Sequence, residues 1–185
     1  MKNRIRNEMK AKRRFMEKTE AVKKSQRAAE IFLNSEIYRS AKMIMLYMPL
    51  GNEADTSEII KKAFADGKSL VLPVTEEATG KITPVAFEEN AVFLKGGFSV
   101  AEPKNSVEVK KSEIDVVLVP GIAFDKKGAR VGFGKGCYDM FLADSRAKKV
   151  GFCYEFQICE EIPADEYDVK MDFLLTETEL METKG

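Results

Sequence analysis

Apolar residues follow two different patterns along the chain. Near the start they recur at helical spacing, as at Ile5, Met9 and Phe15, which predicts helices over residues 2–16 and 18–34. From residue 42 onward they form short continuous runs bounded by glycine, proline and polar residues, which is typical of buried strands. The order of the two patterns predicts a helical segment followed by a sheet.

Six apolar runs are predicted to be strands. They cover residues 42–48, 69–74, 82–87, 113–121, 149–154 and 172–177. The run at 113–121 is the most apolar, so we expect it to be central, and we expect 172–177 to be the last strand. Between the first two runs, Asp55 and Glu58 resemble a capping box that opens a helix, and Gly67 ends it. A β-α-β order of this kind builds parallel sheets.

Length and composition are those of an ordinary globular protein. The 185 residues are 44% hydrophobic and 32% charged, which suffices for a large core. Residues 88–112 look irregular, but no repeat, low-complexity segment or linker divides the chain. We therefore expect a single domain over residues 1–185, of the α/β class. It should have a largely parallel sheet flanked by helices and an N-terminal helical segment.

Charge is balanced overall but unevenly distributed. The formal net charge is zero, yet residues 1–27 hold eleven lysines and arginines against three glutamates, and residues 155–185 hold ten acidic residues against two lysines. The basic start either meets the acidic end in the fold or meets an anionic ligand. The three cysteines lack C-x-x-C spacing, and no apolar secretion signal is evident, so we expect reduced thiols and a cytoplasmic location.

Histidine is absent from the sequence, which limits the available chemistry. The commonest general base and the commonest zinc ligand are therefore missing. Any reaction must rely on carboxylates, cations, backbone amides or a metal held by oxygen atoms.

The segment RVGFGKGCYD, residues 130–139, has the composition of an anion-binding loop. Its three alternating glycines are Gly132, Gly134 and Gly136. Glycines let the backbone approach a ligand and turn its N–H groups inward, and Arg130 and Lys135 add two positive charges. A helix predicted from about residue 137 to 146 follows, and Asp139 in its first turn is placed to hold a hard cation such as Mg²⁺.

Two familiar phosphate-binding motifs do not fit this segment. A P-loop requires G-x-x-x-x-G-K-[ST], but Ala129 stands at the first glycine and Gly136 at the Ser/Thr position. A dinucleotide fingerprint requires G-x-G-x-x-G, but Cys137 stands at the third glycine. The residues alone therefore favour an anion site, with a flexible connection carrying solvated charges as the alternative.

Residues 120–142, PGIAFDKKGARVGFGKGCYDMFL, closely resemble the signature of the 5-formyltetrahydrofolate cyclo-ligases, also called 5,10-methenyltetrahydrofolate synthetases. Four further segments resemble that family: KNRIR near the start, YMPLGNEADT at 47–56, FSVAEP at 98–103 and DVKMDFLLTE at 168–177. The resemblance therefore covers essentially the whole chain. Departures are Val131, where leucine is usual, and Cys137, where tyrosine is usual.

The resemblance implies a ligase that uses ATP and Mg²⁺. The implied reaction closes 5-formyltetrahydrofolate to 5,10-methenyltetrahydrofolate and releases ADP and phosphate. The formyl oxygen attacks the γ-phosphate to give an iminium phosphate, N10 attacks the activated carbon, and phosphate leaves. Because phosphoryl transfer depends mostly on positioning and charge neutralisation, a site without histidine suits it.

The resemblance also assigns the nucleotide and the metal to particular residues. Lys2 and Arg6 are expected to reach the ATP phosphates, and Asp139 and Asp172 to hold Mg²⁺. The phosphate cradle is expected to comprise Arg130, Gly132, Gly134, Lys135, Gly136, Cys137 and Tyr138. Without the resemblance, Lys2 and Arg6 are interpreted as solvated helix charges and Asp172 as a charge at a strand edge.

The folate is assigned by the resemblance to Glu53 and Tyr138, with Arg130, Lys135 and Tyr138 acting at the reacting groups. Cys137 is expected to pack near the folate and to form no covalent intermediate, because the formyl oxygen itself attacks phosphorus. Aromatic candidates for covering the folate are Phe87 and Phe98.

Two other kinds of function use the same features. A nucleic-acid-binding module would use residues 1–27, but it leaves the glycine loop unexplained, and the basic run lacks interleaved aromatic residues. A sugar-phosphate or acyl-CoA enzyme of similar fold stays open because fold does not fix function. We expect a monomer that binds ATP and 5-formyltetrahydrofolate and neither nucleic acid nor a membrane.

Overall fold

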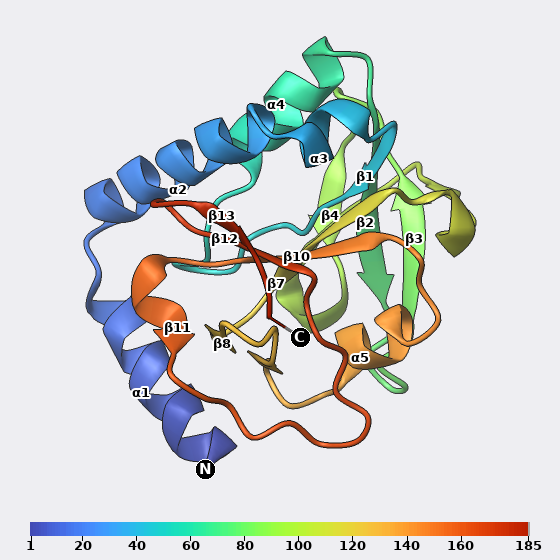
Figure 1. Cartoon of the computed structure of the whole chain (residues 1–185). Helices are drawn as coiled ribbons and strands as arrows, with labels where there is room; N and C mark the ends of the chain where they lie inside the picture. Colours follow the sequence, from blue (N-terminus) through green and yellow to red (C-terminus); the bar gives the residue numbers. More distant parts are fainter. Residues whose placement is uncertain (185) are drawn as a thin grey trace.

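Three helices open the chain, and strands with a few intervening helices and 3-10 turns follow (Figure 1). The computed structural model describes residues 1–184. The helices are α1 (Lys2–Phe15), α2 (Lys18–Leu33), α3 (Glu36–Ser40), α4 (Ser57–Ala65) and α5 (Cys137–Leu142), with 3-10 turns η1 (Gly97–Ser99), η2 (Lys111–Glu113) and η3 (Glu155–Gln157). The main sheet contains β1 (Met43–Met45), β2 (Ser69–Thr75), β3 (Ile82–Ala86), β6 (Val107–Glu108), β7 (Val116–Pro120), β10 (Lys148–Phe152), β12 (Phe173–Leu175) and β13 (Leu180–Glu182). Smaller sheets contain β4 (Phe93–Lys95) with β5 (Ala101–Pro103), and β8 (Ala123–Asp125) with β9 (Arg130–Val131) and β11 (Ile158–Cys159).

The main sheet is parallel at its centre and antiparallel at its edges. Its strand order is β13-β12-β10-β7-β1-β2-β3-β6, and the pairs from β12 to β2 are all parallel. β13, β3 and β6 pair in the antiparallel sense. The prediction of an α/β fold with a largely parallel sheet and a central 113–121 strand is confirmed. The chain progresses outward in one direction from β1 and in the other from β7, so the order reverses between them.

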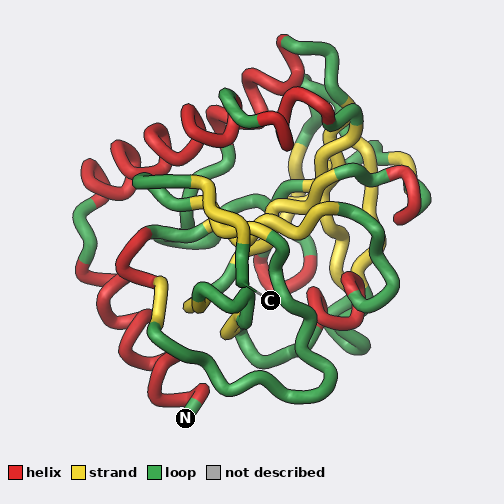
Figure 2. The backbone as a smooth tube through the Cα atoms, in the orientation of Figure 1, coloured by secondary structure: helices red, strands yellow, loops and turns green. Residues whose placement is uncertain are grey.

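Alternating side chains of the central strands build two apolar layers. Ile44 and Leu46 face α2 and α4, where Phe32 is fully buried, whereas Met45 faces the opposite layer with Phe141 of α5. Figures 1 and 2 show α2 and α4 lying together on one side of the sheet, with α5 on the other. Because the strands carry apolar side chains on both faces, they read as continuous hydrophobic runs in the sequence.

Helix α1 packs away from the other helices, against the β8–β9 hairpin. Met9 is buried there with Ile122 and Val131, and Ile5 packs against the same cluster. The charged face of α1 is thereby placed beside the glycine loop that follows β9. The long loop before β12 runs along the same edge as the start of α1 (Figure 2), and Lys2 pairs with Asp165 across it.

The start of α4 differs from the predicted capping box. Thr56 is the N-cap residue, and no side chain caps the helix. The Asp55 carboxylate instead accepts a hydrogen bond from the N–H of Ser57, at 2.8 Å. This local Asx-type bond competes with helix capping, so the helix begins two residues after Asp55.

Short elements account for the other differences from the sequence prediction. Helix α5 ends at Leu142, because the N–H of Ser145 turns back to the Leu142 carbonyl. β13 follows β12, so 172–177 is not the last strand. The predicted irregular segment at 88–112 contains the β4–β5 hairpin and β6, and the β8–β9 hairpin separates β7 from the glycine loop.

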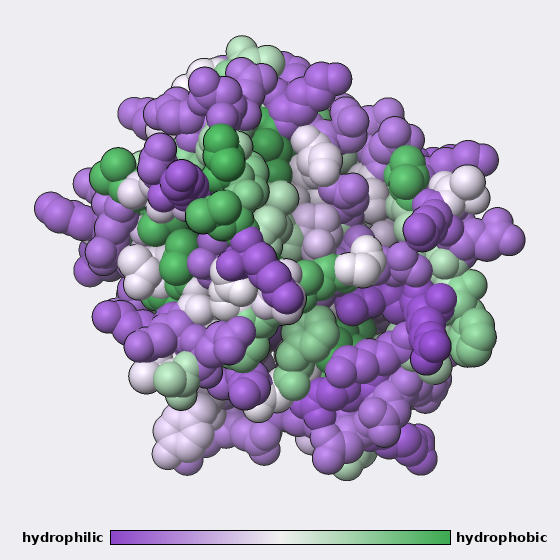
Figure 3. All heavy atoms as spheres, turned by 180° about the vertical axis from the view of Figure 1, so that it is seen from behind, coloured by the Kyte–Doolittle hydropathy of each residue, from purple (hydrophilic) through white to green (hydrophobic). Residues whose placement is uncertain are grey.

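Within residues 1–184 no helix has both the length and the apolar character required to cross a bilayer. Viewed from behind, the surface is mostly hydrophilic, with apolar side chains gathered over part of it (Figure 3).

The fully buried ring of Phe124 lies against two glycines, which generates a prediction about stability. A Cβ atom built on Gly151 would lie 2.5 Å from the Phe124 ring, and one built on Gly121 would lie 2.4 Å from it. We expect Gly151→Ala to lower the free energy of unfolding by about 1–3 kcal/mol through overpacking. Urea unfolding measures this change. Adding Phe124→Leu should recover part of the loss, and an unchanged midpoint for Gly151→Ala would contradict the packing argument.

Candidate active site

A cleft opens at the carboxyl ends of the parallel strands, where the strand order reverses. Its volume is about 570 Å³. Tyr47 after β1, Thr75 at the end of β2 and Pro120 at the end of β7 line its floor, and residues 132–139 form one wall. Open α/β sheets bind ligands at this position because the connections on either side of the reversal leave in opposite directions.

The glycine loop has a backbone that requires glycine at two positions. Gly134 and Gly136 have φ angles of 99° and 67°, in the left-handed region that side chains disfavour. Helix α1 contacts this loop directly, because the Arg6 guanidinium donates a hydrogen bond of 3.0 Å to the Gly132 carbonyl and lies beside Gly134. The predicted juxtaposition of the first helix and the glycine loop is therefore present.

Arg130 lies at the base of the loop with its side chain only 6% exposed. One Nη atom donates to Asp139 at 2.9 Å, and the other donates to the Pro120 carbonyl at 3.3 Å. Its buried Nε has no hydrogen-bond partner among the described residues. The second carboxylate oxygen of Asp139 accepts from the N–H of Val169, at 3.3 Å. Arg130 and Asp139 thus hold each other at the wall of the cleft.

A second acidic group at this end of the cleft was not predicted from the sequence. Asp168 and Asp165 line the cleft, and the Lys2 ammonium lies 2.5 Å from a carboxylate oxygen of each. Burial opposes ionisation of Asp168, but the hydrogen bonds from Lys2 and the Asp165 amide, with the charges of Lys2 and Arg130, outweigh it and lower the pKa of Asp168. Asp168 belongs to the same DVKMDFLLTE segment as Asp172, the residue assigned from the sequence.

Asp172 does not share the cleft with Asp139. Its carboxylate accepts the N–H of Lys149 at 2.8 Å and pairs with the Lys149 ammonium at 3.0 Å. Asp172 directly precedes β12, so it lies at the amino ends of the parallel strands, whereas the cleft opens at their carboxyl ends. The structure therefore does not support the prediction that Asp139 and Asp172 face one metal, and we withdraw Asp172.

The cleft lining also includes two residues with a buried polar atom that has no hydrogen-bond partner among the described residues. One Glu53 carboxylate oxygen accepts the Leu50 N–H at 2.9 Å, while the other has no hydrogen-bond partner and lies 3.7 Å from Arg13. Burial raises the pKa of Glu53, against the opposing effects of Leu50 and Arg13. The buried Tyr138 hydroxyl also lacks a partner, and burial raises its pKa. Because buried polar groups are nearly always hydrogen-bonded, these two atoms are suited to a ligand.

Three more predicted residues are divided between the cleft and the core. Phe98 lines the cleft in a left-handed conformation, φ 52°, with the exposed Lys135 ammonium 5.4 Å from its ring centre. Cys137 is a half-buried free thiol on the same lining. Phe87 is buried against Phe64 and Phe93 instead, with ring centres 5.4 and 5.9 Å away.

Known proteins share this architecture and sequence. The family model described as the 5-formyltetrahydrofolate cyclo-ligase family matches residues 1–177. The 5-formyltetrahydrofolate cyclo-ligase of Mus musculus is 28% identical over 94% of this chain and 92% of its own length. That of Haemophilus influenzae is 32% identical over 75% of this chain and 78% of its own length.

A solved structure agrees with the sequence comparisons. The 5,10-methenyltetrahydrofolate synthetase of Aquifex aeolicus, determined by NMR, superposes with a TM-score of 0.88 at 29% identity, covering 100% of this chain and 93% of that one. Sequence and fold therefore agree, and the chain belongs to the 5-formyltetrahydrofolate cyclo-ligase family.

Proposed function

We propose that this chain uses ATP to cyclise 5-formyltetrahydrofolate to 5,10-methenyltetrahydrofolate, releasing ADP and phosphate. Family membership supports the reaction, and one observation in the cleft supports its location. The cleft brings cations and a glycine loop together with two buried polar atoms, a Glu53 carboxylate oxygen and the Tyr138 hydroxyl, that have no hydrogen-bond partner among the described residues. A nucleic-acid-binding module does not need such buried polar atoms beside its cations.

The phosphate end would act through positive charge that the fold already holds in place. Arg130 and Arg6 are each fixed by two hydrogen bonds, those of Arg6 going to the Gly132 carbonyl and the Asn3 side chain, so little reorganisation is needed as charge develops on the transferring phosphoryl group. Lys135 is exposed at the loop and free to approach the phosphates. Lys2 is paired with Asp165 and Asp168, and would exchange one of them for a phosphate oxygen.

The described residues also fit a magnesium ion. Mg²⁺ commonly binds through one or two carboxylates together with substrate phosphates, and when bound it would neutralise charge on those phosphates. No group of three or more potential ligands occurs within residues 1–184, but Asp139 and Asp168 both line the phosphate end. We propose these two as the acids that hold it.

The folate end would orient the substrate and exclude water. The Glu53 carboxylate oxygen that makes no hydrogen bond would accept one from an N–H group of the folate, and the Tyr138 hydroxyl would donate one. Phe98 offers a ring face to a planar heterocycle. With the formyl group held against the γ-phosphate, its oxygen attacks phosphorus and N10 closes the ring, so Cys137 needs no covalent role.

We also propose that the protein is a cytoplasmic monomer and that the chain forms one domain. Residue 185 lies outside the described residues.

The proposed reaction has a direct test. We expect the protein to convert 5-formyltetrahydrofolate only when ATP and Mg²⁺ are present, because the formyl oxygen must be phosphorylated before N10 attacks. Near-ultraviolet absorbance of the methenyl product measures turnover, and ADP release should match it one for one. ATP-independent conversion, or no conversion with an intact fold, would contradict the proposal.

The cationic residues should act on the chemical step. Losing one preorganised donor typically costs about 10²–10³-fold in rate, so we expect Arg130→Ala and Lys135→Ala each to lower kcat by about that factor. Lys61→Ala, which removes an exposed lysine on α4, is the matched control and should leave kcat unchanged. Wild-type kcat in both cleft variants would remove these residues from the proposed mechanism.

The revised metal assignment distinguishes three acids. Asp139→Asn and Asp168→Asn should each raise the Mg²⁺ concentration needed for half-maximal rate, because each removes a charged oxygen ligand. Asp172→Asn should leave that concentration unchanged, since Asp172 lies at the other edge of the sheet. Magnesium titrations of the steady-state rate measure the effect. A shift seen only in Asp172→Asn would restore the assignment withdrawn above.

A further inference from the structure

A buried tyrosine outside the cleft contacts the backbone of Glu53. Tyr154 follows β10, and its hydroxyl donates a hydrogen bond of 3.1 Å to the Glu53 carbonyl. Its side chain is almost fully buried, and its ring stacks on Phe156 with centres 5.8 Å apart. The hydroxyl therefore holds one fixed position against the segment that carries Glu53.

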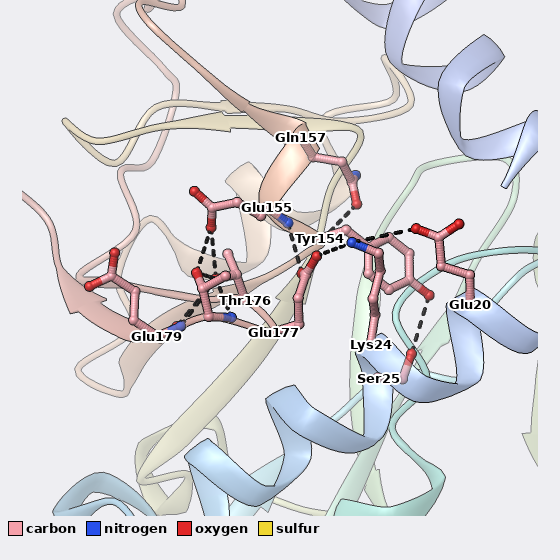
Figure 4. Close-up of polar contacts among 10 residues, drawn as sticks. Glu20, Lys24, Ser25, Tyr154, Glu155, Gln157, Thr176, Glu177 and Glu179 are labelled. Carbon is pink, nitrogen blue, oxygen red and sulfur yellow. Dashed lines mark hydrogen bonds and ion pairs between the residues drawn. The ribbon is translucent and has the colours of Figure 1, made fainter.

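Ser25 of α2 extends this contact into a chain of hydrogen bonds. The Tyr154 and Ser25 hydroxyl oxygens are 3.2 Å apart, and the Ser25 oxygen accepts the N–H of Asp55 at 2.9 Å. Because Tyr154 gives its proton to the Glu53 carbonyl, the Ser25 hydroxyl donates to the Tyr154 oxygen. Figure 4 shows the contact between the Ser25 and Tyr154 hydroxyls. The segment from Glu53 to Asp55 is thus held at both ends by two buried hydroxyls.

Each hydroxyl is itself anchored. The Tyr154 N–H donates to the Gln157 side chain at 2.9 Å, and the Gln157 amide donates to the carbonyls of Gly121 and Ile122, at the start of the β8–β9 hairpin. Beside Ser25, the Lys24 ammonium lies 2.5 Å from Glu177, which also accepts the Glu155 N–H (Figure 4). Through Tyr154 and Gln157, the bonds therefore connect the Glu53 segment to the connection that follows β7.

We propose that Tyr154 and Ser25 are positioning residues that fix the Glu53 carboxylate for the folate. The proposal rests on the function proposed above. Glu53 lies in a loop between β1 and α4, and one of its carboxylate oxygens has no hydrogen-bond partner within residues 1–184, although Arg13 lies 3.7 Å from it. The direction of the carboxylate therefore depends on the Leu50 N–H, on the Arg13 charge and on the backbone that Tyr154 and Ser25 hold.

The first test compares two tyrosines. Tyr154→Phe removes only the hydroxyl and should raise the KM for 5-formyltetrahydrofolate about tenfold, or about 1.4 kcal/mol, while kcat and the KM for ATP stay near wild type. Tyr38→Phe is the matched control, because the Tyr38 hydroxyl donates to Asp66 at 2.6 Å, away from the cleft. It should leave both KM values unchanged. An equal rise in both KM values for Tyr154→Phe would indicate a general structural role and overturn the proposal.

A double-mutant cycle tests whether the hydroxyl acts through Glu53. Calorimetric binding of 5-formyltetrahydrofolate without ATP should weaken in Tyr154→Phe and in Glu53→Gln. Adding Tyr154→Phe to Glu53→Gln should change the affinity less than twofold, because the group that the hydroxyl positions is already altered. A full tenfold further loss in the double variant would contradict the proposal.

A readout without substrate separates this proposal from the proposed function. Carbon-13 NMR follows the titration of Glu53, which Arg13 of α1, Tyr47 after β1 and Tyr138 of α5 also face. Burial raises the pKa of Glu53, and loosening the segment that carries Glu53 would admit water to its carboxylate. The midpoint of the Glu53 titration should therefore fall in Tyr154→Phe but not in Tyr38→Phe. An unchanged midpoint in Tyr154→Phe overturns the positioning role whatever the wild-type activity. Absent turnover with a shifted midpoint overturns only the proposed function.

Discussion

The reversal of strand order between β1 and β7 determines where the candidate functional groups of this protein meet. The connection after β1 leaves toward α4 and carries Glu53, while the connection after β7 leaves toward the β8–β9 hairpin and carries Arg130. Because these two connections diverge, they leave a cleft at the carboxyl ends of the parallel strands. The glycine loop and α1 then cover one wall of a space that the topology already provides.

Charge pairing is the second constraint on the cleft. The zero net charge of the sequence conceals a basic start and an acidic end, and the fold brings them together through Lys2 with Asp165 and Asp168. Arg130 is likewise paired with Asp139. Two of the cations that line the cleft, Lys2 and Arg130, are thus already paired with acids, so an incoming anion must compete with carboxylates for them. A nucleotide that arrives with a divalent cation can satisfy both the cations and the acids, whereas a bare anion cannot.

The sequence predicted the features that depend on long patterns or on a long motif. The two amphipathic helices and the buried strands were identifiable because their apolar patterns extend over many residues. The loop at 130–139 was identifiable because it belongs to a long motif. Asp168 and Asp172 could not be distinguished from the sequence because they are four residues apart in one segment, and only the start of β12 decides at which end of the parallel strands each one lies. The β8–β9 hairpin and the Ser25–Tyr154 contact were not predictable, since they depend on two- or three-residue strands and on a contact between residues 129 positions apart.

The docking of α1 has a consequence for how the chain acquires its structure during synthesis. Lys2 leaves the ribosome long before its partners Asp165 and Asp168, which follow it by 163 and 166 residues. The apolar surface that receives Met9 is formed by Ile122 and Val131, which also emerge late. Closing contacts over such separations is slow, so α1 must wait, with one apolar stripe exposed, until most of the chain has been made. The phosphate end of the cleft is therefore the last part of the molecule to be completed, and a truncated chain lacks it even where its central strands have paired.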